Sequence, residues 1–428
     1  MGVPSYFSYI IRNYPNIIRD WKFFLQNQMF QFHHLFMDCN SIIYDAFHSL
    51  DMDEKTNLSI EDRIINKVCA NIKEYINYIK PSKTLYISFD GVAPLAKMEQ
   101  QRTRRHRTKF LSSLENKDIK WDTCAVTPGT EFMKRLSSRI KYDFKQGYKN
   151  VYKTENIVVS CSDEPGEGEH KLFTYIRENN INMNDTIAVY GLDSDLIMLS
   201  LFHLKYCNNI YVFRDTPEFL KSKLVSDNHD NFLHFLDISQ LGNSIQKEMS
   251  CGSQSERRIY DYVFMCFFLG NDFLPHFPSL NIRTHGMGVL LDIYRLVLGN
   301  YHNKFFINDK NEIDWKYVKA FVVELAKYEK EFLLKEYAHR EQYYKNKLND
   351  RKMDEKNRID NLPLFYRHQE KYICPYEDEW EMRYYKTLFH FERVNNYNIK
   401  DVCINYLQGL EWVYKYYTSN CLHWKWKY

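Results

Sequence analysis

Short apolar runs that end in acidic residues recur through the first half of the chain, and they constrain its fold more than any other feature. The runs are "HLFMD" ending at Asp38, "TLYISFD" ending at Asp90, and "TIAVYGLDSD", which reaches Asp193 and Asp195. Each has the length and composition of a buried strand, and helical patterns at residues 61–79, 95–115 and 166–180 lie between them. This alternation predicts an α/β fold with a mostly parallel central sheet flanked by helices.

The second half of the chain has a helical pattern. A long apolar helix is expected to stop at Gly270 and Asn271, and residues 328–361 are dense in charge, which predicts a solvated helix or a linker. The last segment, "YLQGLEWVYKYYTSNCLHWKWKY", predicts an aromatic-rich helix followed by a Trp-x-Trp turn. We therefore expect a core over residues 1–300 and a helical C-terminal region over residues 301–428 that packs on it.

Composition excludes several classes of protein. The net charge of +3 and the pI of about 8.1 are too mild to indicate nucleic-acid binding by themselves. The cysteines form no C-x-x-C pair, which argues against a zinc ribbon, and the N-terminal residues do not have the pattern of a signal peptide. No stretch of eighteen apolar residues occurs. We expect an intracellular, cytoplasmic protein that contacts no membrane, although the sequence does not distinguish cytoplasm from nucleus or virion.

Seven acidic residues stand at expected loop or helix-start positions after the apolar runs, namely Asp38, Asp90, Glu167, Glu169, Asp193, Asp195 and Asp272. Any one of them alone is explained by a helix cap or a turn. A parallel sheet, however, brings most of them to one edge, where close carboxylates repel and require cations. Oxygen ligands without a His or Cys cluster favour Mg²⁺ or Mn²⁺. Two such ions, about 3.5–4 Å apart, are typical of phosphodiester hydrolysis, so the pattern predicts a metal-dependent nuclease or phosphatase.

A basic stretch, "AKMEQQRTRRHRTKF" at residues 96–110, holds six Lys or Arg and a single Glu. On a helix that begins after Pro94, one face carries Lys97, Gln101, Arg104 and Arg105. Three cations and an amide on one stripe form a compact site for an oxyanion such as a terminal phosphate, since Arg donates paired hydrogen bonds. The alternative is a solvated basic face. The lack of compensating Glu residues at i−4 favours the ligand site.

These motifs together resemble the XRN family of 5′→3′ exoribonucleases over most of the chain. The segments that carry the resemblance are, in order, "MGVPSYF", "FMDCNSIIY", "FDGVAPLAKMEQQRTRRHR", "SCSDEPGEGEHK", "YGLDSDLIMLSL", "CFFLGNDFLPHFPSLNIR" and "GLEWVYKYY" followed by W-x-W. The resemblance implies a nuclease core of the PIN or flap-nuclease type. It also implies hydrolysis of single-stranded RNA from a 5′-monophosphate end, with two Mg²⁺ as cofactors and nucleoside 5′-monophosphates as products, as in RNA decay.

The resemblance also assigns roles to particular residues. The seven acids match the family's metal-binding residues, and Lys97, Gln101, Arg104 and Arg105 match its pocket for the 5′-monophosphate. Tyr44 stands where the family has a His that stacks on the first base, and Trp424, or alternatively Trp426, matches its second stacking residue. For each of these aromatic residues the alternative is core packing.

The sequence departs from the family pattern at the basic helix, which stops near Asn116 instead of running on into a charged extension. It therefore predicts neither processivity nor duplex unwinding. Two other functions stay open: a flap-type DNA endonuclease, which shares the acidic set, and a non-catalytic protein that binds RNA 5′ ends. We expect a monomer, and the sequence identifies no protein partner.

Overall fold

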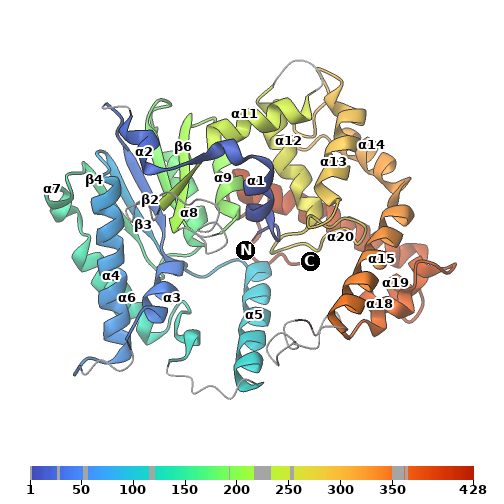
Figure 1. Cartoon of the computed structure of the whole chain (residues 1–428), viewed down its shortest axis with the longest axis horizontal. Coiled ribbons are helices and arrows are strands. Elements are labelled where there is room, and N and C mark those ends of the chain that lie inside the picture. Colours follow the sequence, from blue (N-terminus) through green and yellow to red (C-terminus); the bar gives the residue numbers. More distant parts are fainter. Residues whose placement is uncertain are drawn as a thin grey trace.

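The computed structural model describes residues 2–26, 29–51, 56–114, 121–191, 193–215, 233–250, 255–348, 361 and 365–428. Within these residues a seven-stranded sheet forms the centre of the N-terminal half (Figure 1). The strands are β1 (Ile18–Arg19), β2 (His34–Asp38), β3 (Thr84–Ser88), β4 (Asn156–Ser160), β5 (Thr186–Tyr190), β6 (Asn209–Asp215) and β7 (Leu233–Asp237).

The strand order is β1-β7-β6-β5-β2-β3-β4. The five strands β2 to β6 pair in parallel, whereas β7 and β1 add an antiparallel edge. The prediction of a mostly parallel sheet flanked by helices is confirmed. The three apolar runs that predicted it are β2, β3 and β5, and their rows of Ile, Leu, Val, Phe and Tyr are almost completely buried.

Helices cover both faces of the sheet because alternate residues of each strand point to opposite sides. Leu35 and Met37 pack in one apolar cluster, with α3, α4 and α6, whereas Phe36 between them packs in the other, with α8, α9 and α12. The helices of this half are α1 (Tyr6–Asn13), α2 (Trp21–Leu25), α3 (Asn40–His48), α4 (Ile60–Ile79), α5 (Leu95–Leu114), α6 (Glu131–Asp143), α7 (Lys149–Tyr152), α8 (Gly168–Glu178), α9 (Asp195–His203), α11 (Ile238–Met249) and α12 (Arg257–Cys266).

The rest of the chain is helical, as expected. Its helices are α13 (Gly286–Tyr294), α14 (Trp315–Ala326), α15 (Glu329–Leu348), α18 (His368–Ile373), α19 (Trp380–Phe389) and α20 (Asn396–Thr418), and short helical turns include η1 (Pro15–Ile17), η2 (Thr123–Ala125), η3 (Gln146–Tyr148), η4 (Phe267–Leu269) and η5 (Arg295–Gly299). The second half of α20 and the length of α14, through Val318, Phe321 and Leu325, belong to the same apolar cluster as α8 and α9. Core packing is therefore continuous across residue 300, and the domain boundary there stays a prediction.

Two features of the fold bear on the site. The helix α5 projects from the body of the molecule (Figure 1), and its first N–H, from Leu95, donates to the carbonyl of Trp424 at 2.9 Å. The C-terminal segment therefore lies against the base of the basic helix.

Among the described helices, none combines the length and the apolar character needed to cross a membrane.

Candidate active site

The sheet reverses its direction of winding between β2 and β5. From β2 the chain proceeds outward through β3 and β4, and from β5 it proceeds the other way through β6 and β7. The two central strands are parallel, with Met37 opposite Tyr190, so their carboxyl ends meet at one edge. Ligands of open α/β sheets bind at such a switch point, beyond the carboxyl ends of the strands.

The candidate acids reach this edge from several elements. Asp38 ends β2, Asp90 lies two residues beyond β3, and Asp193 lies three residues beyond β5. The remaining four come from helix starts or a loop: Glu167 and Glu169 at the first turn of α8, Asp195 at the start of α9, and Asp272 beyond η4.

One cavity of about 220 Å³ collects most of the predicted site residues. Five of the seven acids line it, together with all four residues of the cationic stripe and Tyr44; these are Asp38, Asp90, Glu167, Glu169, Asp193, Lys97, Gln101, Arg104, Arg105 and Tyr44. Asp195 and Asp272 do not line this cavity, but Asp195 raises the pKa of the lining acid Glu169, and Asp272 forms an ion pair with the lining residue Lys97. The carboxylates and the cations therefore face the same space rather than different sides of the molecule.

Lys97 lies between the two charge groups rather than in the cationic stripe alone. Its ammonium Nζ lies 2.7 Å from Glu167 Oε2 and 2.5 Å from Asp272 Oδ2, and the residue is only 7% exposed. Burial alone would lower the pKa of the ammonium, but the two carboxylates outweigh it and hold the pKa well above its usual range. Burial alone would raise the pKa of Glu167 and of Asp272, but Lys97, together with other nearby groups such as the Tyr416 hydroxyl at Glu167, outweighs burial and lowers both pKa values.

Four acids that form no ion pair with Lys97 have raised rather than lowered pKa values. Burial first, and then neighbouring carboxylates, raise the pKa of Asp38, Asp90 and Glu169, and they raise the pKa of Asp195 to about 6. Within the described part of the chain, three buried carboxylate oxygens have no hydrogen-bond partner: Asp38 Oδ1, Glu169 Oε2 and Asp195 Oδ1. Unpaired buried charge is strongly unfavourable unless cations compensate it. Oxygen-rich donors of this kind fit hard divalent cations such as Mg²⁺.

Local backbone geometry explains the glycines that flank these acids. A side chain at Gly168 would place its Cβ 2.6 Å from Asp38 Oδ1, and a Cβ at Gly2, where φ is +52°, would lie 1.5 Å from Asp195 Oδ1. The N–H of Gly168 also donates to Asp90 Oδ1 at 2.6 Å. These close approaches hold Asp38 and Asp195 against neighbouring backbone.

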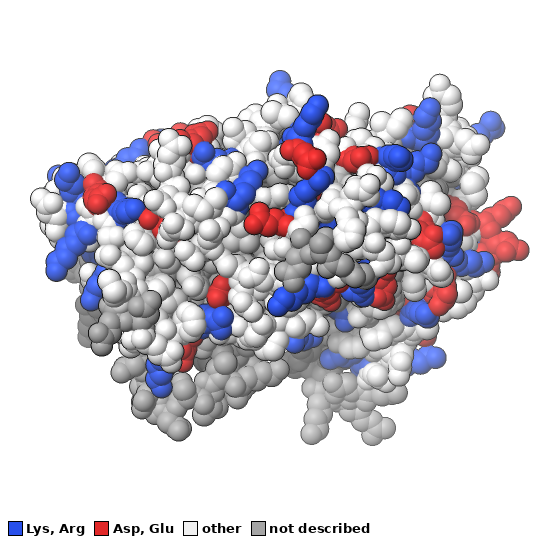
Figure 2. Space-filling model, turned by 90° about the horizontal axis from the view of Figure 1, so that it is seen from above, with Lys and Arg blue, Asp and Glu red and all other residues white. Residues whose placement is uncertain are grey.

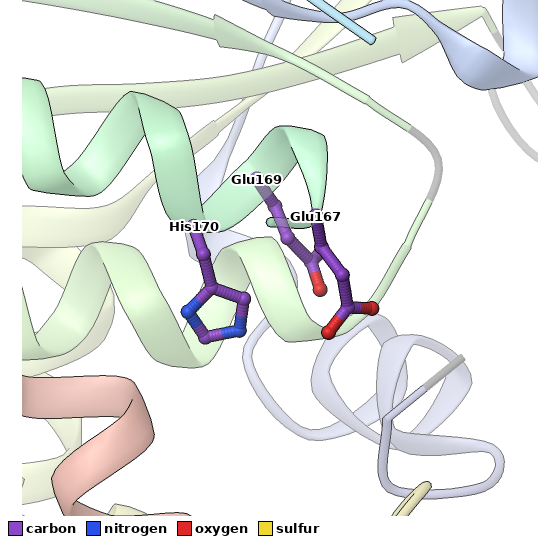
Figure 3. Close-up of side chains that lie close together, drawn as sticks. All are labelled: Glu167, Glu169 and His170. Carbon is purple, nitrogen blue, oxygen red and sulfur yellow. The ribbon is translucent and has the colours of Figure 1, made fainter. Parts of the chain in front are cut away.

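The start of α8 presents a third potential ligand that the sequence analysis did not select. Glu167, Glu169 and His170 have ligand atoms within 4.8 Å of one another, and Figure 3 shows their side chains directed to one side of the helix. Burial lowers the pKa of His170 to about 4, so its imidazole is neutral at pH 7, and it stacks on Tyr416 at 3.7 Å. The only available signal was its place in the run "EGEH".

Other supporting residues were also missed. The Tyr416 hydroxyl donates to Glu167 Oε1 at 2.8 Å, Gln100 Nε2 donates to Asp272 Oδ1 at 3.0 Å, and Asn40 Oδ1 accepts from the Asp90 N–H at 3.1 Å. Tyr416 lies in the C-terminal helix α20, far from Glu167 in sequence, so no local pattern indicates the contact.

The stripe on α5 differs in exposure along its length. Gln101 and Arg105 are half-buried at the cavity, whereas Arg104 is exposed and also borders a neighbouring cavity with Arg107 and Lys427. Of the two arginines, Arg105 is therefore the more buried at the acid-lined cavity.

The two aromatic candidates have different surroundings. Tyr44, on α3, lines the cavity, and burial raises the pKa of its hydroxyl although the charges of Arg104 and Arg105 lower it. Trp424 is 41% exposed at the base of α5 and does not line the cavity. Trp426 stacks on Trp412 at 5.0 Å and is packed against the body, so Trp424 is the more accessible of the two.

The chain is similar to known 5′-3′ exoribonucleases along most of its length. A family model described as "XRN 5'-3' exonuclease N-terminus" matches residues 1–216, and another described as "Xrn1 helical domain" matches residues 253–372 and 367–428. The chain is 31% identical over 401 residues to 5′-3′ exoribonuclease 2 of Kluyveromyces lactis, covering 79% of this chain and 40% of that protein. It is 33% identical over 355 residues to 5′-3′ exoribonuclease 1 of Saccharomyces cerevisiae, covering 77% and 23%.

The exoribonuclease 1 of Homo sapiens is 27% identical over 492 residues, covering 100% of this chain and 28% of that protein. The chain therefore spans less than half the length of these relatives. Among solved structures, the catalytic core of Rad2 in complex with DNA substrate aligns over 100% of this chain and 90% of that one, with 14% identity and a TM-score of 0.39. A similarity at that level supports no conclusion about this protein.

Proposed function

Because the chain belongs to the XRN family of 5′-3′ exonucleases, we propose that it is a 5′→3′ exoribonuclease that degrades single-stranded RNA from a 5′-monophosphate end. Its products are nucleoside 5′-monophosphates, and its role is in RNA decay. The observation that carries the proposal is the shared cavity, which is lined both by carboxylates and by the cationic stripe. The carboxylates suit divalent cations, and the cations suit a phosphate.

The acids supply the place for two Mg²⁺ ions, for which Mn²⁺ can substitute. Asp38, Glu169 and Asp195, which carry the unpaired oxygens, are the primary candidates, and Asp90, Glu167, Asp193 and Asp272 complete the set. When bound, such ions activate a water molecule and stabilise the charge on the leaving oxygen. Lys97 and Tyr416 orient Glu167, and Lys97 and Gln100 orient Asp272, so that the carboxylates are held in place before substrate enters.

The cationic side of the cavity binds and positions the RNA end. Gln101, Arg104 and Arg105 donate to the 5′-phosphate, and Arg is well suited to this role because its donors are paired and always charged. Tyr44 supplies a flat ring for the first base, a contact typically worth about 1–3 kcal/mol. A cavity of about 220 Å³ is also smaller than the roughly 300–1,000 Å³ of ordinary ligand sites. It therefore disfavours bulky capped ends.

The experiment compares one RNA sequence carrying a 5′-monophosphate, a 5′-hydroxyl or a 5′-triphosphate, incubated with Mg²⁺. We expect the monophosphate form to be shortened fastest, and we expect Asp193→Ala to abolish shortening of all three. A matched DNA strand separates the proposal from a flap-type endonuclease, because faster DNA cleavage would favour that alternative. Binding of the monophosphate RNA without any shortening, in either Mg²⁺ or Mn²⁺, would favour a non-catalytic end-binding protein.

A further inference from the structure

An apolar cavity of about 400 Å³ lies between the Pro275–Pro278 loop and the helices α14, α15, α19 and α20. Its wall is built mainly from large apolar and aromatic side chains, including Phe277, Val318, Trp380, Tyr384 and Tyr406. None of the seven acids of the candidate active site lines it. Its size is within the range of roughly 300–1,000 Å³ that ligand sites occupy.

The apolar surface continues outside this cavity. Leu407, in the cavity wall, is 42% exposed, and Ile404, one helical turn earlier on α20, is also 42% exposed. An exposed apolar surface that continues along α20 beyond the cavity suits contact with another protein.

The rim of the cavity is acidic. Glu329 and Glu381 both line it, and within the described residues neither forms an ion pair. Three further exposed acids, Glu377, Asp378 and Glu379, immediately precede the lining residue Trp380, and of these Glu377 lies 3.8 Å from the guanidinium of Arg383. Figure 2 shows acidic side chains gathered at the right-hand end of the molecule, the end that carries α15, α18 and α19 in Figure 1.

The combination of an apolar floor and an anionic rim defines the chemistry of an occupant. The negative rim repels phosphates and therefore disfavours RNA. It favours Lys or Arg, and the aromatic side chains of the wall offer cation–π contacts to the same groups. A second copy of this chain would bring its own acidic rim to the contact, which is unfavourable.

We propose that this groove is a docking site for a segment of a partner protein that presents basic side chains next to bulky apolar ones. The site is separate from the proposed exonuclease centre and gives the chain a means of recruitment to, or regulation by, another protein. The apolar side chains fill the cavity, and the basic side chains meet Glu329 and Glu381 at its rim.

The test uses the full chain and short fluorescein-labelled peptides that share one framework of Leu and Trp but carry Arg, Gln or Glu at the same positions. Fluorescence polarisation should show the Arg peptide binding most tightly and the Glu peptide most weakly, with a difference that shrinks at high salt. The double variant Glu329→Gln/Glu381→Gln should weaken binding of the Arg peptide by about fivefold, the size expected for two exposed ion pairs. The double variant should leave the affinity for the Gln peptide unchanged. The control is Glu178→Gln, an exposed acid on α8.

Two further measurements test the apolar part of the docking site, which the charge variants do not address. Leu407→Ser should weaken binding of all three peptides, because it removes an apolar contact that they share. Cys403 is an exposed thiol in the cavity wall, so the Arg peptide should slow its alkylation, whereas the exposed Cys124, which does not line the cavity, should react at an unchanged rate.

Equal affinity for the Arg and Glu peptides would overturn the proposal, as would unchanged Arg-peptide binding in the double variant or unchanged alkylation of Cys403. If the chain instead dimerises through this face, with Leu407→Ser abolishing the dimer and no peptide bound, self-association replaces the proposal.

Discussion

Replacing Asp195 by Asn should stabilise the fold while abolishing the proposed activity. Asp195 is 2% exposed, and burial together with nearby acids raises its pKa from 3.8 to about 6. A shift of about two units is equivalent to about 3 kcal/mol of unfavourable free energy for the charged form, at 1.36 kcal/mol per unit. The Asn side chain has nearly the same shape and carries no charge. In the presence of EDTA at pH 8, the variant should therefore gain about 1–3 kcal/mol in free energy of unfolding.

The contribution of Asp195 to the free energy of unfolding depends on pH with a definite sign. Because the folded-state pKa lies above the unfolded value, the charge of Asp195 destabilises the fold fully above pH 6 and not at all below about pH 4. The wild-type protein should thus lose stability between pH 4 and 6 relative to Asp195→Asn. Asp261, whose pKa burial raises to about 7, adds a loss of the same sign in both proteins, so it cancels in the comparison.

The assay is urea unfolding followed by circular dichroism at pH 4.5, 6 and 8, with Asp401→Asn, an exposed acid on α20, as the control. Adding Mg²⁺ should reverse the ranking, since a ligand at 100 times its Kd stabilises the folded state by about 2.7 kcal/mol and the variant lacks one ligand. A variant less stable than wild type in EDTA at pH 8, or a difference that is independent of pH, would refute the reasoning.

Three further changes test the other parts of the site. Arg105→Ala should reduce the preference for a 5′-monophosphate over a 5′-hydroxyl, measured as the ratio of kcat/KM values, by about tenfold or more, because charge-assisted hydrogen bonds contribute about 1.5–3 kcal/mol each. The control Arg107→Ala, on the same helix but outside the acid-lined cavity, should leave this preference unchanged. Equal effects of the two substitutions would contradict the assignment. Tyr44→Phe should keep the KM for RNA while Tyr44→Leu raises it, since only stacking is at stake; a similar KM in both would argue for core packing instead. Tyr416→Phe removes the hydrogen bond to Glu167 and should raise the Mg²⁺ concentration needed for half-maximal activity, and an unchanged Mg²⁺ titration would show that the contact is only structural.

Much of this architecture follows from local patterns in the sequence. Asp38 and Asp90 could be placed at one sheet edge because each comes at the end of an apolar run of strand length. The helical periodicity of the basic stretch put Lys97, Gln101, Arg104 and Arg105 on one face, and all four line one cavity; their role stays a prediction. Neither inference needs information about distant parts of the chain.

Contacts between distant segments could not be predicted in the same way. Lys97 has the spacing of the phosphate-binding stripe, yet its ammonium is paired with Glu167 and Asp272, a consequence of how α5 enters the acid cluster. Tyr416 reaches Glu167 only because α20 packs on α8 and α9. The antiparallel strand β7, which lies between β6 and the edge strand β1, follows an intervening segment with no strand pattern in the sequence. Residues 349–360, part of the stretch predicted as a solvated helix or linker, lie outside the described residues.

The central claim is that five of the seven proposed metal-binding acids share one small cavity with the proposed phosphate-binding cations. The most direct test is the length of the first product released from RNA that is labelled at its 5′-monophosphate. If the acids and the cations act together in this cavity, chromatography at early times in Mg²⁺ should show labelled nucleoside 5′-monophosphate as the sole labelled product. Labelled fragments of several nucleotides, or cleavage that is indifferent to the 5′ end, would contradict the account.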